Sequence, residues 1–124
     1  MAVAGTRHLG SHVVCPQIEH AAVLLASERH QPTTWVGCDE SGIVDPDELL
    51  AVVSTNTSLT HLQWANHEVG SLQRISAARA ICSSAGSLLH VYATAAVGHV
   101  PVDFGSSSID LLSCGAHKFG GLMA

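Results

Sequence analysis

The stretch LTHLQWANHEVGSLQRISAARAICSSAGSLLHVY, residues 59–92, decides the fold because it predicts a strand, a helix and a strand in succession. Residues 59–65 predict the first strand. Residues 75–84 are rich in alanine and predict a helix that ends near Gly86, since glycine favours the C-terminal end of a helix. Residues 88–92 predict the next strand. This order is typical of a unit in which a helix joins two parallel strands.

The same alternation continues on both sides of this stretch. Asp45 followed by Pro46 predicts a helix start, because aspartate caps the first turn and proline suits the first helical position. Further strands are expected at 11–15, 33–37 and 109–113, and further helices at 19–29 and 45–53. The strands are near-continuous apolar runs, which predicts an α/β fold with a mostly parallel sheet and helices on both faces.

The composition resembles that of a protein interior. Of the 124 residues, 47% are hydrophobic and only 12% are charged. This share of charged residues is low for a free-standing domain. We therefore expect residues 11–124 to be an incomplete domain, part of a larger one, preceded by an irregular N-terminal segment at residues 1–10.

The charge pattern argues against several classes of partner. The formal net charge is -5, and no run of basic residues occurs. Binding to nucleic acid or to an anionic membrane surface therefore has no electrostatic support. No apolar stretch approaches the roughly 18 residues that a spanning helix needs, and residues 1–7 lack a secretory core. We expect a cytoplasmic protein that binds neither nucleic acid nor membrane.

The cysteines and histidines follow no metal-binding pattern. Four widely spaced cysteines without a CxxC pair or a secretion signal predict buried free thiols rather than disulfides. The nine histidines include no HExxH motif and no zinc-finger spacing, so no metal site is expected. The cysteines are Cys15, Cys38, Cys82 and Cys114.

Candidate functional residues follow the predicted strands, because ligands of parallel sheets bind beyond the carboxyl ends of the strands. These positions are His20, 66–70, 92–96 and 115–118. Lys118 is the single lysine of the chain. A lysine amine can condense with the aldehyde of pyridoxal phosphate. The dipeptide His-Lys by itself is more typical of an ordinary exposed lysine at a strand end, and this interpretation competes with the first.

Several short motifs, in order and with compatible spacing, resemble those of class V aminotransferases and, more closely, of NifS-like cysteine desulfurases. They are EHAAV at 19–23, WANHEVG at 64–70, HVYATA at 90–95 with GHVPVD at 98–103, and AHKFGG at 116–121. The resemblance implies a central fragment of the large domain of a fold type I pyridoxal phosphate enzyme. Such enzymes are usually homodimers that take sulfur from cysteine, release alanine and keep the sulfur as a persulfide.

The resemblance also implies roles for individual residues. Lys118 corresponds to the Schiff-base lysine and His20 to the histidine that stacks on the cofactor ring, so these two are the predicted catalytic residues. His117 resembles a residue that helps hold the cofactor phosphate, and His67 replaces an asparagine near the cofactor. All four are predicted to bind pyridoxal phosphate. The family's sulfur-accepting cysteine lies beyond the matched region, so none of the four cysteines is assigned as the persulfide carrier.

Three further positions depart from the family pattern. Tyr92 stands where the family has an aspartate that pairs with the pyridinium nitrogen. With a pKa near ~10, a phenol is neutral at pH 7 and does not keep that nitrogen protonated. Ala95 replaces a glutamine that donates to the cofactor, and Gly115 replaces a phosphate-binding serine. These changes predict weak cofactor binding and little or no activity for this chain.

Two hypotheses of different classes follow. The first is a segment of a pyridoxal phosphate-dependent cysteine desulfurase, with Lys118 and His20 as its catalytic residues. The alternative is a non-catalytic remnant or scaffold of the same fold that has lost the cofactor. A histidine-rich metal-binding protein is a third and minor hypothesis.

Overall fold

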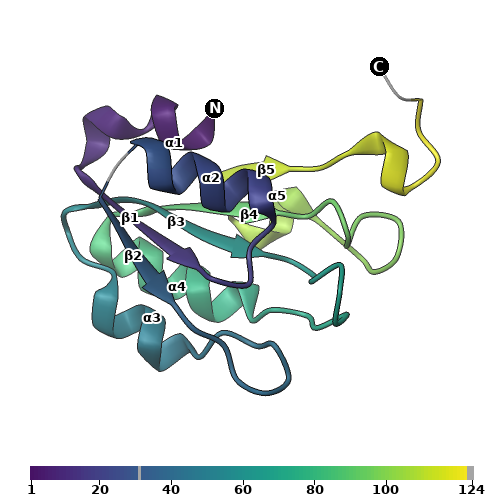
Figure 1. Cartoon of the computed structure of the whole chain (residues 1–124), viewed down its shortest axis with the longest axis horizontal. Coiled ribbons are helices and arrows are strands. Elements are labelled where there is room, and N and C mark those ends of the chain that lie inside the picture. Colours follow the sequence, from purple (N-terminus) through teal and green to yellow (C-terminus); the bar gives the residue numbers. More distant parts are fainter. Residues whose placement is uncertain (31, 123–124) are drawn as a thin grey trace.

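The computed structural model describes residues 1–30 and 32–122, and its centre is a five-stranded sheet (Figure 1). The strands lie in the order β2-β1-β3-β4-β5, and every neighbouring pair is parallel. The strands are β1 His12–Pro16, β2 Thr33–Val36, β3 Thr57–Gln63, β4 Leu88–Tyr92 and β5 Leu111–Ser113. The helices are α1 Ala2–Gly5, α2 Ala21–His30, α3 Pro46–Val52, α4 Ile75–Ala85 and α5 Phe104–Ser107, with 3-10 turns η1 Arg7–Leu9 and η2 Ala116–Lys118. The predicted α/β fold class is confirmed.

Helices cover both faces of the sheet, with α1 and α2 on one face and α3 and α4 on the other (Figure 1). Successive residues of a strand point to opposite faces. Val13 of β1 accordingly packs in a core with Val23 of α2. Its neighbour Val14 packs in the opposite core with Leu49 of α3 and Cys82 of α4. Both faces of the central strands are therefore buried, which explains their continuous apolar runs.

Strand β3 begins earlier than predicted, within the polar residues 54–58 that we expected to form a loop. Ser58 Oγ donates to the carbonyl oxygen of His12 at 3.0 Å, and Thr57 Oγ1 lies 2.9 Å from His12 Nδ1. Because these partners on β1 replace water, buried hydroxyl groups can occupy the first positions of an interior strand. The strand ends at Gln63, two residues before the predicted end.

Three other segments also differ from the sequence-based expectation. Residues 1–10, expected to be irregular, contain α1 and η1, and Val3 of α1 is buried in the core beside α2. Strand β5 is limited to Leu111–Ser113. The expected loop around residues 101–108 includes α5, which forms because the Asp103 side chain accepts the backbone N–H of Ser106 at 3.1 Å. Each difference involves an element of only three or four residues.

Helices α3 and α4 begin and end close to the predicted positions. Asp45 caps α3 by accepting the backbone N–H of Asp47 at 2.9 Å, and Pro46 is the first helical residue. Helix α4 ends at Gly86, whose φ of 74° lies in the left-handed region that glycine favours. The local capping signals were therefore correct.

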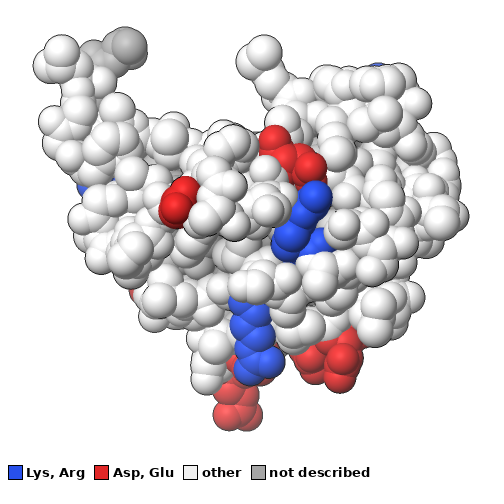
Figure 2. All heavy atoms as spheres, turned by 180° about the vertical axis from the view of Figure 1, so that it is seen from behind, with Lys and Arg blue, Asp and Glu red and all other residues white. Residues whose placement is uncertain are grey.

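The surface carries few charges. In the view of Figure 2, the most prominent Lys and Arg side chains lie beside Asp and Glu side chains, and no continuous basic area is visible on that face. Arg79 and Asp110 form an ion pair with a 2.6 Å N–O distance. Within residues 1–30 and 32–122, none of the helices has the length and apolar character required to cross a bilayer.

All four cysteines are free thiols, but only two of them are buried. Cys15 and Cys82 lie in the core as predicted, whereas Cys38 and Cys114 are exposed. The prediction was wrong for the latter pair because Cys38 lies two residues after β2 and Cys114 one residue after β5, where the chain returns to the surface.

Candidate functional site

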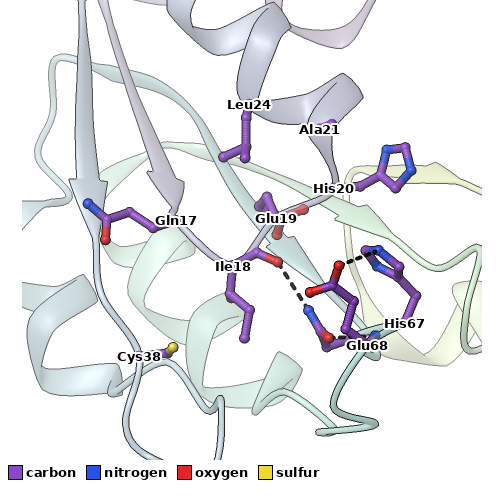
Figure 3. Close-up of a pocket in the computed structure, with 10 residues that line it drawn as sticks. Gln17, Ile18, Glu19, His20, Ala21, Leu24, Cys38, His67 and Glu68 are labelled. Atoms are coloured by element: carbon purple, nitrogen blue, oxygen red, sulfur yellow. Dashed lines mark hydrogen bonds and ion pairs between the residues drawn. The ribbon is translucent and has the colours of Figure 1, made fainter.

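The sheet changes its direction of winding between β1 and β3, which are neighbours. From β1 the chain moves outward through α2 to β2, whereas β3, β4 and β5 are added on the other side. The segments that leave β1 and β3 therefore diverge, and such a switch point at the carboxyl ends of parallel strands is a common ligand-binding crevice. A cavity of about 470 Å³ lies here, lined by residues 17–21 and 66–68 together with Leu24 and Cys38 (Figure 3).

Asn66 holds the two sides of this crevice together. Its Nδ2 donates to the carbonyl oxygen of Ile18 at 3.2 Å, and this bond crosses the crevice (Figure 3). Its Oδ1 accepts the backbone N–H groups of Glu68 and Val69 at 2.8 and 2.9 Å. Asn66 is buried, so its loss would leave several shielded polar groups unpaired. The amide thereby positions the segment that carries His20.

A second cavity, of about 210 Å³, lies at the carboxyl end of β4 and includes Lys118. His20 and His67 line both this cavity and the crevice, so the two spaces adjoin. The structure thus brings together all four site residues that the sequence predicted, although they come from separate segments of the chain. The lining residues are His20, His67, Tyr92, Thr94, Ala95, His117 and Lys118.

Lys118 lies on η2, the turn that follows β5. Lys118 and the adjacent His117 are exposed, and the Lys118 backbone N–H donates to the Gly115 carbonyl oxygen at 3.1 Å. A Cβ atom at position 115 would lie only 2.8 Å from Cε1 of His117 and 3.2 Å from Cγ2 of Thr94. Glycine therefore leaves the space that the His117 ring occupies. The exposed position keeps the lysine amine accessible to a ligand from solvent.

Three rings meet where the two cavities adjoin. The rings of His20 and Tyr92 are stacked, with centroids 5.1 Å apart and planes inclined by 18°. The His67 ring is tilted by 57° to that of His20, with centroids 5.5 Å apart. Offset stacking at such distances is favourable for flat rings. Sequence analysis did not predict the contact between Tyr92 and His20, because no local pattern connects residues so far apart in the chain.

Glu19 is a buried acid at the crevice whose importance sequence analysis missed. Its side chain is 4% exposed, and neither carboxylate oxygen has a well-aligned hydrogen-bond donor among the described residues. Burial raises the pKa of the carboxyl group to about 8, and the backbone N–H groups of Gln63 and His20 offset part of that rise. The carboxyl group is therefore mostly protonated at pH 7. The sequence signal that could have indicated Glu19 was its place beside His20, directly before the apolar residues 21–25.

A chain of buried hydrogen bonds crosses the sheet beside the site. The Nδ1 atoms of His61 and His90 are 2.8 Å apart, and His90 Nε2 lies 2.8 Å from Ser113 Oγ. Burial lowers the pKa of His61 to about 3 and that of His90 to about 4, so both rings are neutral at pH 7. Nε2 of His61 is buried without a hydrogen-bond partner among the described residues. These three residues and Tyr92 line a third cavity of about 170 Å³.

The site combines an amine, several imidazoles and a phenol around one cavity. A deprotonated lysine amine attacks carbonyl carbons, imidazoles exchange protons near neutral pH, and flat rings stack on planar ligands. In the described part of the chain, no group of three or more His, Cys, Asp or Glu side chains is placed to hold a metal ion. The arrangement therefore suits a planar carbonyl compound.

Comparison with known proteins gives consistent matches. The family model for aminotransferase class V matches residues 1–123. The cysteine desulfurase IscS of Neisseria meningitidis serogroup A is 39% identical over 113 residues, which cover 88% of this chain and 28% of that protein. The cysteine desulfurase IscS of Methanosarcina thermophila is 36% identical over 120 residues, covering 93% of this chain and 30% of that protein. The chain thus spans under a third of the length of these curated relatives.

Solved structures show the same likeness. A NifS-like protein matches with a TM-score of 0.88 and 30% identity, and the match covers 98% of this chain and 35% of the NifS-like chain. SspA, solved in complex with cysteine, matches with a TM-score of 0.83 over 94% of this chain and 35% of its own. At 23% identity, the second match shows a likeness of fold alone.

Proposed function

The chain belongs to the class V aminotransferase family, whose cysteine desulfurases depend on pyridoxal phosphate, and on this premise we propose that it carries the lysine site of such a desulfurase. The observation that carries the proposal is the meeting of Lys118, His20 and His117 in one cavity beyond the carboxyl end of the sheet. In the proposed reaction the Cβ–Sγ bond of cysteine breaks, the sulfur joins an acceptor thiol as a persulfide, and alanine is released.

Lys118, His20, His117 and His67 fit the proposed cofactor in their chemistry, whereas Tyr92 and Ala95 of the same cavity do not supply the carboxylate and the amide that the family has there. When bound, pyridoxal phosphate supplies an aldehyde for the lysine and a ring that draws electrons from an attached amino acid. Lys118 would hold the aldehyde carbon through Nζ, with the aldehyde oxygen leaving as water. The amine must first lose its proton, which the imidazoles of the cavity could accept. His20 offers a flat face to the ring, and His117 can donate a ring N–H to the phosphate. His67 adds a second polar contact at the rim.

The proposal extends to organisation and partners. Residues 11–124 correspond to part of the large domain, with residues 1–10 as the preceding segment. The substrate is cysteine and the assembly is a homodimer, supported by the named desulfurase relatives and by exposed apolar side chains such as Leu50, Val69 and Phe119. Four free thiols suit a reducing compartment and support a cytoplasmic location.

The test compares the unaltered chain with Lys118→Ala and Lys118→Arg. Each protein is mixed with pyridoxal phosphate, reduced with borohydride and examined by mass spectrometry for one added pyridoxyl phosphate. We expect the adduct on residue 118 of the unaltered chain and on neither variant, because alanine lacks the amine and arginine keeps its proton at pH 7. Equal labelling of the three proteins would overturn the proposal.

A second candidate function is a scaffold of the same fold that binds no cofactor. It is favoured by one observation, the stacking of Tyr92 on His20 inside the proposed cofactor cavity. The scaffold predicts no adduct and no ligand-dependent change in thermal unfolding. A Lys118-dependent adduct at micromolar cofactor concentrations would exclude it.

A further inference from the structure

We propose that Tyr92 is a gate: its ring covers the stacking face of His20, and a planar aromatic ligand reaches Lys118 when Tyr92 moves into the cavity beside His61. The inference rests on the proposed function, since it concerns how the ligand of that site enters.

The closed position of the gate is defined by ring geometry. The Tyr92 and His20 rings are nearly parallel, with an interplanar angle of 18° and a centroid distance of 5.1 Å. This is the position that a planar ligand would take in order to stack on the same imidazole. Tyr92 and a ligand ring therefore compete for one face of His20.

The small size of the Lys118 cavity is consistent with Tyr92 in the closed position, where its ring narrows the space. At about 210 Å³ it is smaller than the ~300–1,000 Å³ typical of ligand pockets. Tyr92 forms part of its wall, so movement of that one ring would enlarge the space beside Lys118. The His67 ring does not cover the stacking face of His20 as the Tyr92 ring does, because the His67 ring is tilted by 57° to that of His20.

The open position has both space and a polar partner. Tyr92 also lines the 170 Å³ cavity that contains His61, His90 and Ser113. His90 and Tyr92 lie two positions apart on β4, so their side chains point to the same face of the sheet. Nε2 of His61 is buried there without a hydrogen-bond partner among the described residues. In either tautomer of His61, a phenol hydroxyl can pair with this atom, since the hydroxyl both donates and accepts.

The test uses pyridoxine phosphate, which has the ring and phosphate of the cofactor but an alcohol in place of the aldehyde. Its dissociation constant is measured by calorimetry for the unaltered chain, Tyr92→Ala and Tyr92→Phe. Removing the competing ring should tighten binding by Tyr92→Ala roughly two- to tenfold, the range expected for one aromatic stack. Tyr92→Phe keeps the ring but loses the hydroxyl for His61, so it should bind no more tightly than the unaltered chain.

A second measurement keeps the proposal testable if Tyr92→Ala folds poorly. Tyr92 is the single tyrosine, so its ring resonances can be identified directly by NMR. The nuclear Overhauser contact between Tyr92 and His20 should disappear when pyridoxine phosphate saturates the unaltered chain. Persistence of this contact at saturation would overturn the gate.

The outcomes separate the gate from the proposed function. If Tyr92→Ala unfolds cooperatively but binds no tighter, while the Lys118 adduct still forms, the gate is wrong and the proposed function stands. If Tyr92→Ala binds tighter and Tyr92→Phe does not, the gate is supported. If none of the proteins binds pyridoxine phosphate or forms an adduct, the proposed function fails and the gate fails with it.

Discussion

Burial of Glu19 changes the pKa of its carboxyl group and thereby the pH dependence of stability. In an unfolded chain its carboxyl group has an ordinary pKa of 4.5, whereas burial at the crevice raises the pKa to about 8. Between these values the folded protein holds a proton that the unfolded chain has released. The contribution of the protonated Glu19 side chain to the free energy of unfolding is therefore fully present below pH 4.5 and is lost as the pH rises through 8.

Glu19→Gln should remove this pH dependence, because the amide is similar in size and does not ionise. We expect the free energy of unfolding of Glu19→Gln, relative to the unaltered chain, to rise by roughly 1 kcal/mol per pH unit between pH 5 and 8. Urea unfolding at several pH values measures this difference. Glu28→Gln, on the exposed side of α2, is the control and should show no such trend. A flat difference for Glu19→Gln would mean that Glu19 is not protonated in the folded protein.

At the scale of elements, the loop after β2 supports the loop after β3. The carbonyl oxygen of Gly42 accepts hydrogen bonds from Gln73 Nε2 at 2.7 Å and from Ser71 Oγ at 2.9 Å. A Cβ at Gly42 would lie 2.9 Å from Cγ2 of Val69 and 3.1 Å from Cδ1 of Ile18. Val69 and Ile18 belong to the two segments that Asn66 joins at the crevice. The glycine therefore allows close packing behind the site.

Two glycines offer a matched test of this packing. Gly42 and Gly70 have nearly equal φ values of 73° and 74°, but a Cβ at Gly70 would meet no atom within 4 Å. Both alanine substitutions should cost ~1–2 kcal/mol from the left-handed backbone conformation. Gly42→Ala should cost a further ~1–3 kcal/mol because of crowding. Urea unfolding of the two variants measures the difference. Equal destabilisation would show that Val69 and Ile18 can move away from a Cβ at position 42 without loss of stability.

At the scale of the whole molecule, the sheet is stable at its centre and weaker at the edge that carries the site. Every residue of β3 is buried, whereas all three residues of β5 are only partly buried. Strand β5 also has a neighbour on one side only, and it leads directly to Lys118 on η2. A ligand that binds Lys118 therefore acts at an edge of the sheet that is less protected than its centre.

Hydrogen exchange should reveal this gradient. We expect β3 amides to exchange more slowly than β5 amides by more than about tenfold, because exchange from β5 requires only local opening. Addition of pyridoxal phosphate should slow exchange in β5 and η2, because a ligand stabilises the state that binds it. Amides of α4, which lies on the opposite face of the sheet from α1 and α2, serve as the control. Uniform exchange across the five strands would contradict the gradient.

Much of the fold follows from local sequence patterns. Asp45 with Pro46 marked the start of α3, Gly86 marked the end of α4, and continuous apolar runs indicated a sheet buried on both faces. The start of β3 was missed because the hydrogen-bond partners of Thr57 and Ser58 lie on a different strand. Capping and apolar patterns act over a few residues, whereas the satisfaction of a buried hydroxyl group depends on the neighbouring strand.

The sequence by itself indicated the fold class and the segments that reach the carboxyl edge of the sheet, since parallel strands end at one edge. The family resemblance then singled out Lys118, His20, His67 and His117 within these segments as the predicted site residues. Tertiary structure decided the rest: the stacking of Tyr92 on His20, the burial that protonates Glu19, and the shared cavity around Lys118. The physical reason is one of range. Chain order fixes which residues reach the carboxyl edge of the sheet, but ring contacts, desolvation and cavity volume depend on segments that meet only after folding.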